Sequence, residues 1–140
     1  MERQYHGTNS KTATNITNGL IDRNLGGGEL GKGFYTGNLL FEAIAWAWHK
    51  YKKDNAVAIF SIEDTDFLKL DPLCLDKPTT IRYRNLIRCK DETKIFEFNK
   101  NAVWAPIVGK EAYNFTQIKF ESKQAEDLIN GKTVIKEIFQ

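Results

Sequence analysis

Residues 31–37, Gly-Lys-Gly-Phe-Tyr-Thr-Gly, constrain the fold of this chain more than any other segment. Aromatic and β-branched residues favour an extended backbone, while the glycines around them permit tight turns and the close approach of another molecule. A run with helical periodicity follows directly, over residues 38–53. Together the two segments predict a ligand-facing wall in front of a helix.

The predicted helix over residues 38–53 is expected to bury one broad apolar side. Glu42 and Lys50 belong to its polar side, and Trp46 lies four residues from each, so its ring projects with the polar set. This tryptophan is either a scattered surface aromatic or an aromatic wall beside the loop of Tyr35. The apolar side expected to be buried comprises Leu40, Phe41, Ala43, Ile44, Ala45, Ala47, Trp48 and Tyr51.

Length and composition indicate a single domain over residues 1–140, because 140 residues with 41% hydrophobic composition are too few for two ordinary cores. The net charge of +2 is small, and the basic residues alternate with acids, which argues against a dedicated nucleic-acid or membrane-surface protein. No segment approaches the roughly 18 apolar residues of a membrane span or has the apolar core of a signal peptide. We therefore expect a cytoplasmic protein without a membrane partner. The overall balance leaves open a local basic patch, notably at Arg82, Arg84, Arg88 and Lys90.

Metal binding is not expected. Cys74 and Cys89 lie 15 residues apart, no CxxC motif is present, and the chain has only two histidines. This pattern fits neither a zinc site nor a disulfide framework. The glycine-rich residues 26–32 also lack the Ser or Thr that completes a phosphate-binding loop.

The predicted elements do not alternate regularly between strand and helix, which favours the α+β class. Strands are expected over residues 4–8, 56–62, 66–70, 103–108, 116–120 and 133–139. Besides residues 38–53, helices are expected within residues 8–18 with Ser10 as the cap, from Thr79 or Thr80 to about Lys90, and over residues 122–130 before Gly131.

His6 is the first candidate for chemistry, because it stands at the end of the first predicted strand, before Gly7 and Thr8. An imidazole next to a backbone without a Cβ and a hydroxyl can bind a polar ligand. The alternative is a structural histidine that forms a hydrogen bond at the strand end. No Ser-His or Cys-His spacing indicates a nucleophile.

Taken in order, several segments resemble the ADP-ribosyltransferases. They are Tyr5-His6-Gly7-Thr8, Leu30-Gly31-Lys32-Gly33-Phe34-Tyr35-Thr36, a helix with Ala43 and Trp46, and a late strand that opens at Gln117. The closest likeness, over about residues 4–130, is to small bacterial members of the poly-ADP-ribose-polymerase and diphtheria-toxin-like branch, which is marked by a His-Tyr-Glu triad. The resemblance implies two packed, mostly antiparallel sheets with a few helices around an NAD cleft.

The resemblance also implies roles for individual residues. His6 would bind the adenosine-side ribose of NAD, and the backbone of Gly7 would meet the nicotinamide carboxamide. Tyr35 would pack against the nicotinamide ring, and Trp46 would close its other face with stacking and cation–π energy of about 1–2 kcal/mol each. The remaining motif positions of the implied NAD site are Thr8, Gly33, Phe34 and Ala43.

The third motif departs from the family, because Gln117 stands where a glutamate is usual. Cleavage of the nicotinamide–ribose bond develops positive charge on the ribose, which a neutral amide cannot neutralise. Glu121 lies on the same strand face but roughly 13 Å along it, too far for the same task. Glu111 is either a base for the incoming nucleophile or a solvated loop acid. Tyr113 and Asn114 are candidates for acceptor recognition.

The resemblance therefore implies a mono-ADP-ribosyltransferase that uses NAD as co-substrate and modifies a protein or nucleic-acid acceptor. By analogy, such a compact domain is a toxin or effector of a toxin–antitoxin or phage-conflict system, with an antitoxin or immunity protein as partner. Two alternatives remain at this point. Water would replace the acceptor in an NAD glycohydrolase, and loss of the glutamate would leave a non-catalytic NAD- or ADP-ribose-binding module.

Overall fold

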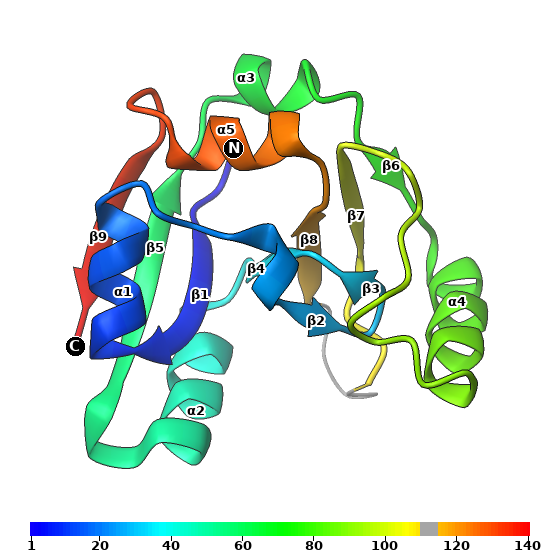
Figure 1. Cartoon of the computed structure of the whole chain (residues 1–140), viewed down its shortest axis with the longest axis horizontal. Coiled ribbons are helices and arrows are strands. Elements are labelled where there is room, and N and C mark those ends of the chain that lie inside the picture. Colours follow the sequence, from blue (N-terminus) through cyan, green and yellow to red (C-terminus); the bar gives the residue numbers. More distant parts are fainter. Residues whose placement is uncertain (110–114) are drawn as a thin grey trace.

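The computed structural model describes residues 1–109 and 115–140 (Figure 1). Glu111, Tyr113 and Asn114, which the sequence suggested for the acceptor side, lie outside the described residues. The strands are β1 (Gln4–Asn9), β2 (Gly27–Gly28), β3 (Gly31–Lys32), β4 (Phe34–Gly37), β5 (Asn55–Ser61), β6 (Leu73–Cys74), β7 (Ala102–Pro106), β8 (Thr116–Phe120) and β9 (Ile135–Phe139). The helices are α1 (Ser10–Thr17), α2 (Leu40–Tyr51), α3 (Asp64–Leu68), α4 (Lys77–Cys89) and α5 (Lys123–Asn130), with short 3-10 turns η1 (Arg23–Leu25) and η2 (Lys52–Asp54).

One mixed sheet in the order β6-β7-β8-β4-β1-β5-β9 forms the centre of the described chain, and β2 and β3 pair separately (Figure 1). Its strand pairs are antiparallel except β6 with β7. β1 meets β4 at one position, Tyr5 opposite Gly37, whereas β1 follows β5 from Gln4 to Asn9. The α+β class is confirmed. The expected two packed sheets are not observed. The β6-β7-β8-β4 half and the β1-β5-β9 half belong to one sheet, because Tyr5 of β1 pairs with Gly37 of β4.

The main core lies between the sheet and helices α1, α3 and α5. Ile118 and Phe120 of β8 pack there with Phe60 of β5 and Phe67 of α3, each at most 2% exposed. The aromatic rings of Phe67 and Phe120 pack edge to face, with their centroids 6.4 Å apart. Because successive side chains of a strand point to opposite faces, the other face of β8 carries Gln117 and Lys119, and Glu121 follows directly after the strand.

Several predicted elements are confirmed, and one is of the wrong type. The strand expected over residues 66–70 is wrong, because residues 66–68 belong to α3 and residues 69–70 form the turn after it. Asp64 and Asp66 in the first turn of α3 interact favourably with the helix dipole, and Phe67 is its one buried apolar residue. α4 begins before Thr79 because the Asp76 side chain accepts a hydrogen bond from the Thr79 amide (2.9 Å). Likewise Asn9, and not Ser10, caps α1.

The expected burial of a broad face of α2 is wrong. Phe41 is 76% exposed and Trp48 is 52% exposed, whereas Ala47 is fully buried. The reason is a narrow contact with β1: a Cβ at Gly7 would overlap the backbone oxygen of Ala43 and lie 3.2 Å from the Ala47 Cβ. Small residues thus let the helix approach the strand closely, and the larger side chains remain outside the contact.

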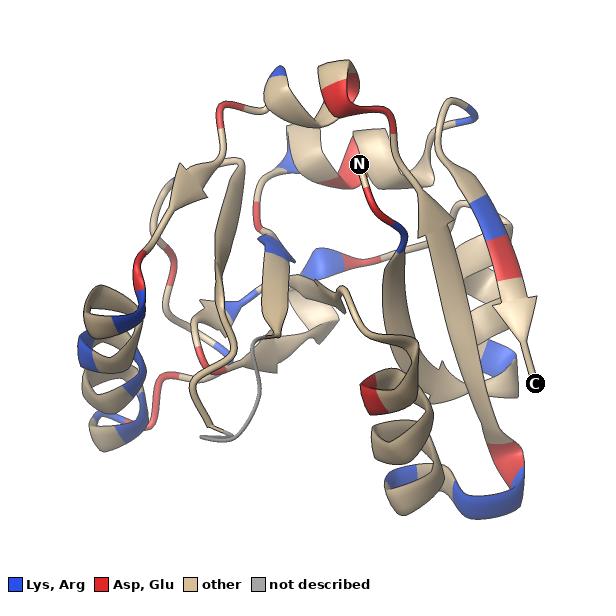
Figure 2. Cartoon of the chain, turned by 180° about the vertical axis from the view of Figure 1, so that it is seen from behind, with Lys and Arg blue, Asp and Glu red and all other residues tan. Residues whose placement is uncertain are grey.

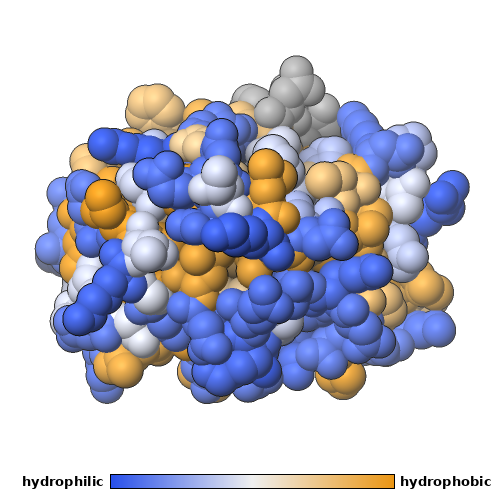
Figure 3. All heavy atoms as spheres, turned by 90° about the horizontal axis from the view of Figure 1, so that it is seen from above, coloured by the Kyte–Doolittle hydropathy of each residue, from blue (hydrophilic) through white to orange (hydrophobic). Residues whose placement is uncertain are grey.

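The basic patch that the overall balance left open lies on α4, at the opposite end of the molecule from β9 (Figures 1 and 2). Arg82, Arg88 and Lys90 are exposed there, and Arg84 is partly exposed. At the end that carries α3 and α5, hydrophilic and apolar side chains are interspersed (Figure 3). Cys74 and Cys89 are free and exposed. Within the described residues, no helix is both long and apolar enough to cross a bilayer.

Candidate functional site

A cleft of about 380 Å³ opens beside the position where β1 and β4 diverge. The sequence motifs meet there: His6 comes from β1, Tyr35 from β4, Trp46 from α2 and Gln117 from β8. Thr8 does not join them, since it is buried opposite Ala56 and is not part of the cleft wall. Four other residues named from the motifs also line the cleft: Gly7, Gly33, Phe34 and Ala43.

His6 presents a neutral imidazole with a defined tautomer. Its Nδ1 lies 2.6 Å from the backbone oxygen of Tyr35. A carbonyl only accepts hydrogen bonds, so Nδ1 carries the proton and Nε2 is left as an acceptor. Burial lowers the pKa of His6 below its usual 6.5, and its ring stacks on Phe34 with centroids 4.4 Å apart.

Tyr35 contributes a ring to the cleft and uses its hydroxyl to hold the preceding turn. The hydroxyl donates to the backbone oxygen of Gly31 (2.6 Å) and accepts from the amide of Leu30 (3.1 Å). Burial raises the pKa of Tyr35 well above its usual value of 10.0. Gly28 approaches the ring so closely that a Cβ there would lie 2.9 Å from Cζ. The hydroxyl is therefore a structural group, and the ring is the part of Tyr35 that a ligand can meet.

Trp46 lies on the cleft wall and remains 51% exposed. The Nζ of Lys50 lies 4.9 Å from its ring centroid, and Tyr51 meets the ring edge-on at 6.1 Å. Trp46 therefore lines the same cavity as Tyr35 and His6, which is the second of the two interpretations given for it.

Gln117 is buried at the base of the cleft and holds a carboxylate that the sequence motifs did not predict. Its Nε2 donates to Glu29 Oε2 (3.0 Å) and to the backbone oxygen of Pro106 (3.1 Å). Both partners can only accept, which fixes the orientation of the amide. The side-chain oxygen of Gln117 accepts no hydrogen bond from the described residues, and none of their unpaired side-chain oxygens is sealed from solvent. The amide oxygen therefore faces the cleft as a neutral acceptor.

Glu29 stands in the turn between β2 and β3 and also lines the cleft. Besides the Gln117 bond, its carboxylate accepts from the amides of Gly109 (2.7 Å) and Val108 (3.2 Å). The sequence contained a signal for it: Glu29 is the only acid between Asp22 and Glu42, and it directly precedes the Leu-Gly-Lys-Gly segment. Its partner Gln117 is 88 residues away, so the contact itself was not predictable from local pattern.

Residues 93–97 brace the β2–β3 hairpin that carries Glu29. The amide of Gly28 donates to the Thr93 oxygen (3.1 Å), and the amide of Lys32 donates to the Phe96 oxygen (2.9 Å). An ion pair between Lys32 and Glu97 (3.1 Å) adds to these contacts. The hairpin is thus held from outside the cleft, which limits the positions that the Glu29 carboxylate can adopt.

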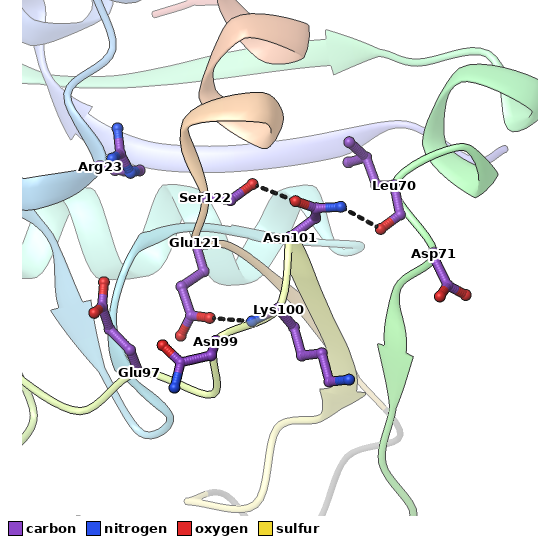
Figure 4. Close-up of a pocket in the computed structure, with 9 residues that line it drawn as sticks. All are labelled: Arg23, Leu70, Asp71, Glu97, Asn99, Lys100, Asn101, Glu121 and Ser122. Atoms are coloured by element: carbon purple, nitrogen blue, oxygen red, sulfur yellow. Dashed lines mark hydrogen bonds between the residues drawn. The ribbon is translucent and has the colours of Figure 1, made fainter.

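A second cavity, of about 440 Å³, lies beside Glu121 (Figure 4). The Glu121 carboxylate accepts from the amides of Phe98 (2.6 Å) and Lys100 (2.9 Å) and pairs with Lys119 Nζ at 2.7 Å. Asn101 bridges Ser122 and the Leu70 oxygen in the same region, as the dashed lines show. Here the polar groups join one loop to the sheet, and Glu121 is committed to that task.

Comparison with known proteins adds no family assignment, since no protein-family model and no curated protein matches the chain. Among the described residues, no group of three or more His, Cys, Asp and Glu side chains is arranged to hold a metal ion.

Proposed function

We propose that this protein binds NAD in the cleft of His6 and transfers a single ADP-ribose unit to a macromolecular acceptor. The observation that supports this most strongly is the convergence of His6, Tyr35, Trp46 and Gln117, from four different elements, on one cavity. Its volume of about 380 Å³ falls in the range of roughly 300–1,000 Å³ that is usual for small-molecule sites.

The side chains present suit the two ends of a nicotinamide nucleotide. The unprotonated Nε2 of His6 can accept a hydrogen bond from a ribose hydroxyl, since Nδ1 is already engaged with Tyr35. The Tyr35 and Trp46 rings offer aromatic surface to a flat, positively charged pyridinium, which gains stacking and cation–π energy. Binding would thus select the ligand by shape and charge.

The reaction that this site would catalyse is cleavage of the bond between nicotinamide and ribose. The transition state carries oxocarbenium character, so acceptors placed near the ribose lower its energy. Gln117 supplies a neutral acceptor at the base of the cleft, and its amide hydrogens are already used. Single transfer, rather than extension into a polymer, is the outcome we propose, and by analogy an effector role.

Incubation of the purified protein with labelled NAD, with and without a cell lysate, tests this proposal. We expect nicotinamide release and an added ADP-ribose mass on a lysate component. Rapid formation of free ADP-ribose without acceptor would instead indicate a glycohydrolase, and tight NAD binding without nicotinamide release would indicate a binding module. Either result would replace the proposed transferase.

Trp46→Ala provides a matched test of the binding site, with Trp48→Ala as the control on the same helix. Trp48 is similarly exposed, at 52%, but is not part of the cleft wall. An aromatic contact worth about 0.5–1.5 kcal/mol corresponds to a loss of roughly twofold to tenfold in NAD affinity. We expect this loss in calorimetric titration for Trp46→Ala alone. Equal affinities of the two variants would contradict NAD binding at this wall.

A further inference from the structure

We propose that Glu29 is the catalytic carboxylate of this site, a role that rests on the proposed function. In the transfer reaction, the bond between the nicotinamide nitrogen and the ribose C1′ breaks, and its electron pair leaves with nicotinamide. A new bond forms between C1′ and a hydroxyl oxygen of the acceptor or of water. The proton of that hydroxyl passes to the Glu29 carboxylate and then to solvent, so that no further reactant is needed.

The charge that the reaction requires is present beside Gln117. Among the described residues of the cleft wall the acids are Glu29 and Glu42. Glu42 stands in the first turn of α2, whereas Glu29 Oε2 lies 3.0 Å from Gln117 Nε2. A carboxylate at this position can offset a developing positive charge, which the Gln117 amide can only meet as a neutral acceptor.

The Glu29 carboxylate has capacity left for a ligand. From the described residues it accepts three hydrogen bonds, donated by Val108, Gly109 and Gln117. Since a carboxylate has about four lone-pair sites, one further donor such as a hydroxyl can bind. The side chain is partly exposed and lines the cleft, so that such a donor can reach it.

The surrounding contacts hold Glu29 in place before any ligand binds. Its hairpin is fixed to residues 93–97 through the backbone of Gly28 and Lys32, and its head group is fixed by the three donors. A charge that is already positioned costs little reorganisation when the transition state forms. The geometry therefore fits a catalytic group better than a mobile loop acid.

Glu29→Gln removes the charge with almost no change in shape. We expect nicotinamide release to fall by about a hundredfold or more, while the dissociation constant for NAD changes less than about threefold. Glu137→Gln is the matched control, because Glu137 is an exposed acid of β9 that is not part of the cleft wall and does not contact the hairpin of Glu29. Its release rate should equal that of the wild type.

The double variant Glu29→Gln/Gln117→Glu exchanges the two side chains, so that the pair again has one carboxylate and one amide. We expect the double variant to release nicotinamide at least about tenfold faster than Glu29→Gln alone. Gln117→Glu alone should not gain activity, since it would place two carboxylates side by side and disfavour the ionised form of one. Failure of the exchange to recover any activity would contradict the assignment of the charge to this pair.

Three results separate the two proposals. If the wild type releases no nicotinamide, the transferase proposal fails and the role of Glu29 fails with it. If the wild type is active and Glu29→Gln stays within about threefold of it, the role of Glu29 alone is overturned. Should Glu29→Gln not fold, Glu29→Asp decides: it keeps the charge but withdraws it by one methylene, and a wild-type rate would overturn the role, whereas a loss of at least about tenfold supports it.

Discussion

Gln117 and Lys119 lie on the same face of β8, and the polar pairs that they form with Glu29 and Glu121 differ in how completely their hydrogen-bonding capacity is used. Lys119 and Glu121 are 0% and 3% exposed, and the ammonium donates to Glu121 and to the Leu30 oxygen while it lies 4.9 Å from the Phe98 ring. Gln117 lies two residues before Lys119 on β8, and both Gln117 and its partner Glu29 line the cleft with acceptor capacity left for a ligand. One pair is closed to ligands, and the other is open.

We interpret the closed pair as structural and the open pair as part of the proposed NAD site. A buried charge is tolerated only when all its partners are in place, and Glu121 has amide donors on two sides besides Lys119. Burial lowers the pKa of Lys119, and the adjacent carboxylate opposes that shift. The open pair has fewer of its hydrogen-bonding sites occupied by protein groups, so a substrate can bind to those that remain. Substitutions on the closed side should therefore cost stability, and substitutions on the open side should cost function.

The largest stability effect is expected for Lys119→Met. It leaves the Glu121 carboxylate buried without its counter-ion, a change that typically costs about 3–5 kcal/mol. Urea unfolding monitored by circular dichroism measures the loss. Lys123→Met is the control, because Lys123 forms its ion pair with Asp127 on the surface and its removal should leave the midpoint nearly unchanged. Similar midpoints for the two variants would break the distinction between the pairs.

An intermediate effect is expected for Gly7→Ala on the cleft side. The new Cβ would overlap the backbone oxygen of Ala43, which cannot move without α2, so overpacking should cost about 1–3 kcal/mol. NAD affinity should fall as well, since α2 carries Trp46. Gly37→Ala is the control: its Cβ would lie 3.6 Å from the Thr116 oxygen, an ordinary contact. Thermal unfolding of both variants measures the difference, and a stable Gly7→Ala would show that α2 can withdraw from β1.

The smallest effect is expected for the contribution of His6 to the pH dependence of stability. Because the pKa of His6 is lowered in the folded protein, the unfolded chain binds a proton first as the pH falls below 6.5. The free energy of unfolding should therefore decrease from about pH 6.5 downward, with a contribution of at most about 1.4 kcal/mol per pH unit. Chemical denaturation at pH 7.5 and 5.5 measures this slope. His6→Gln should reduce it, and an unchanged slope would place the acid sensitivity elsewhere.

Elements with strong local signals were predictable, whereas contacts distant in sequence were not. β8 begins at Thr116 and ends at Phe120 as expected, and the Ser122 cap marks the start of α5. The five residues of α3 are too few to show a helical period, and their one buried apolar residue also fits a strand. In α2 the periodicity located the helix but not the part of it that β1 covers.

The candidate site divides in the same way. The motifs identified His6, Tyr35, Trp46 and Gln117, whose shared cleft depends on an order of segments that can be seen in the sequence. Glu29 was missed because its importance comes from one hydrogen bond across 88 residues. Thr8 belonged to a motif, but its side chain is buried within the sheet. A motif indicates the neighbourhood of a residue, whereas side-chain direction depends on the assembled strands.

The two halves of the sheet are joined between β1 and β4 at one paired position, Tyr5 opposite Gly37. His6 belongs to the half of the sheet with β1 and β5, and α2 with Trp46 packs on that half, whereas Tyr35 and Gln117 belong to the half with β4 and β8. A small change in the splay of the halves would alter the width of the gap between these walls. A ligand that contacts both walls would therefore connect the two halves of the sheet at the point where the strands themselves pair least.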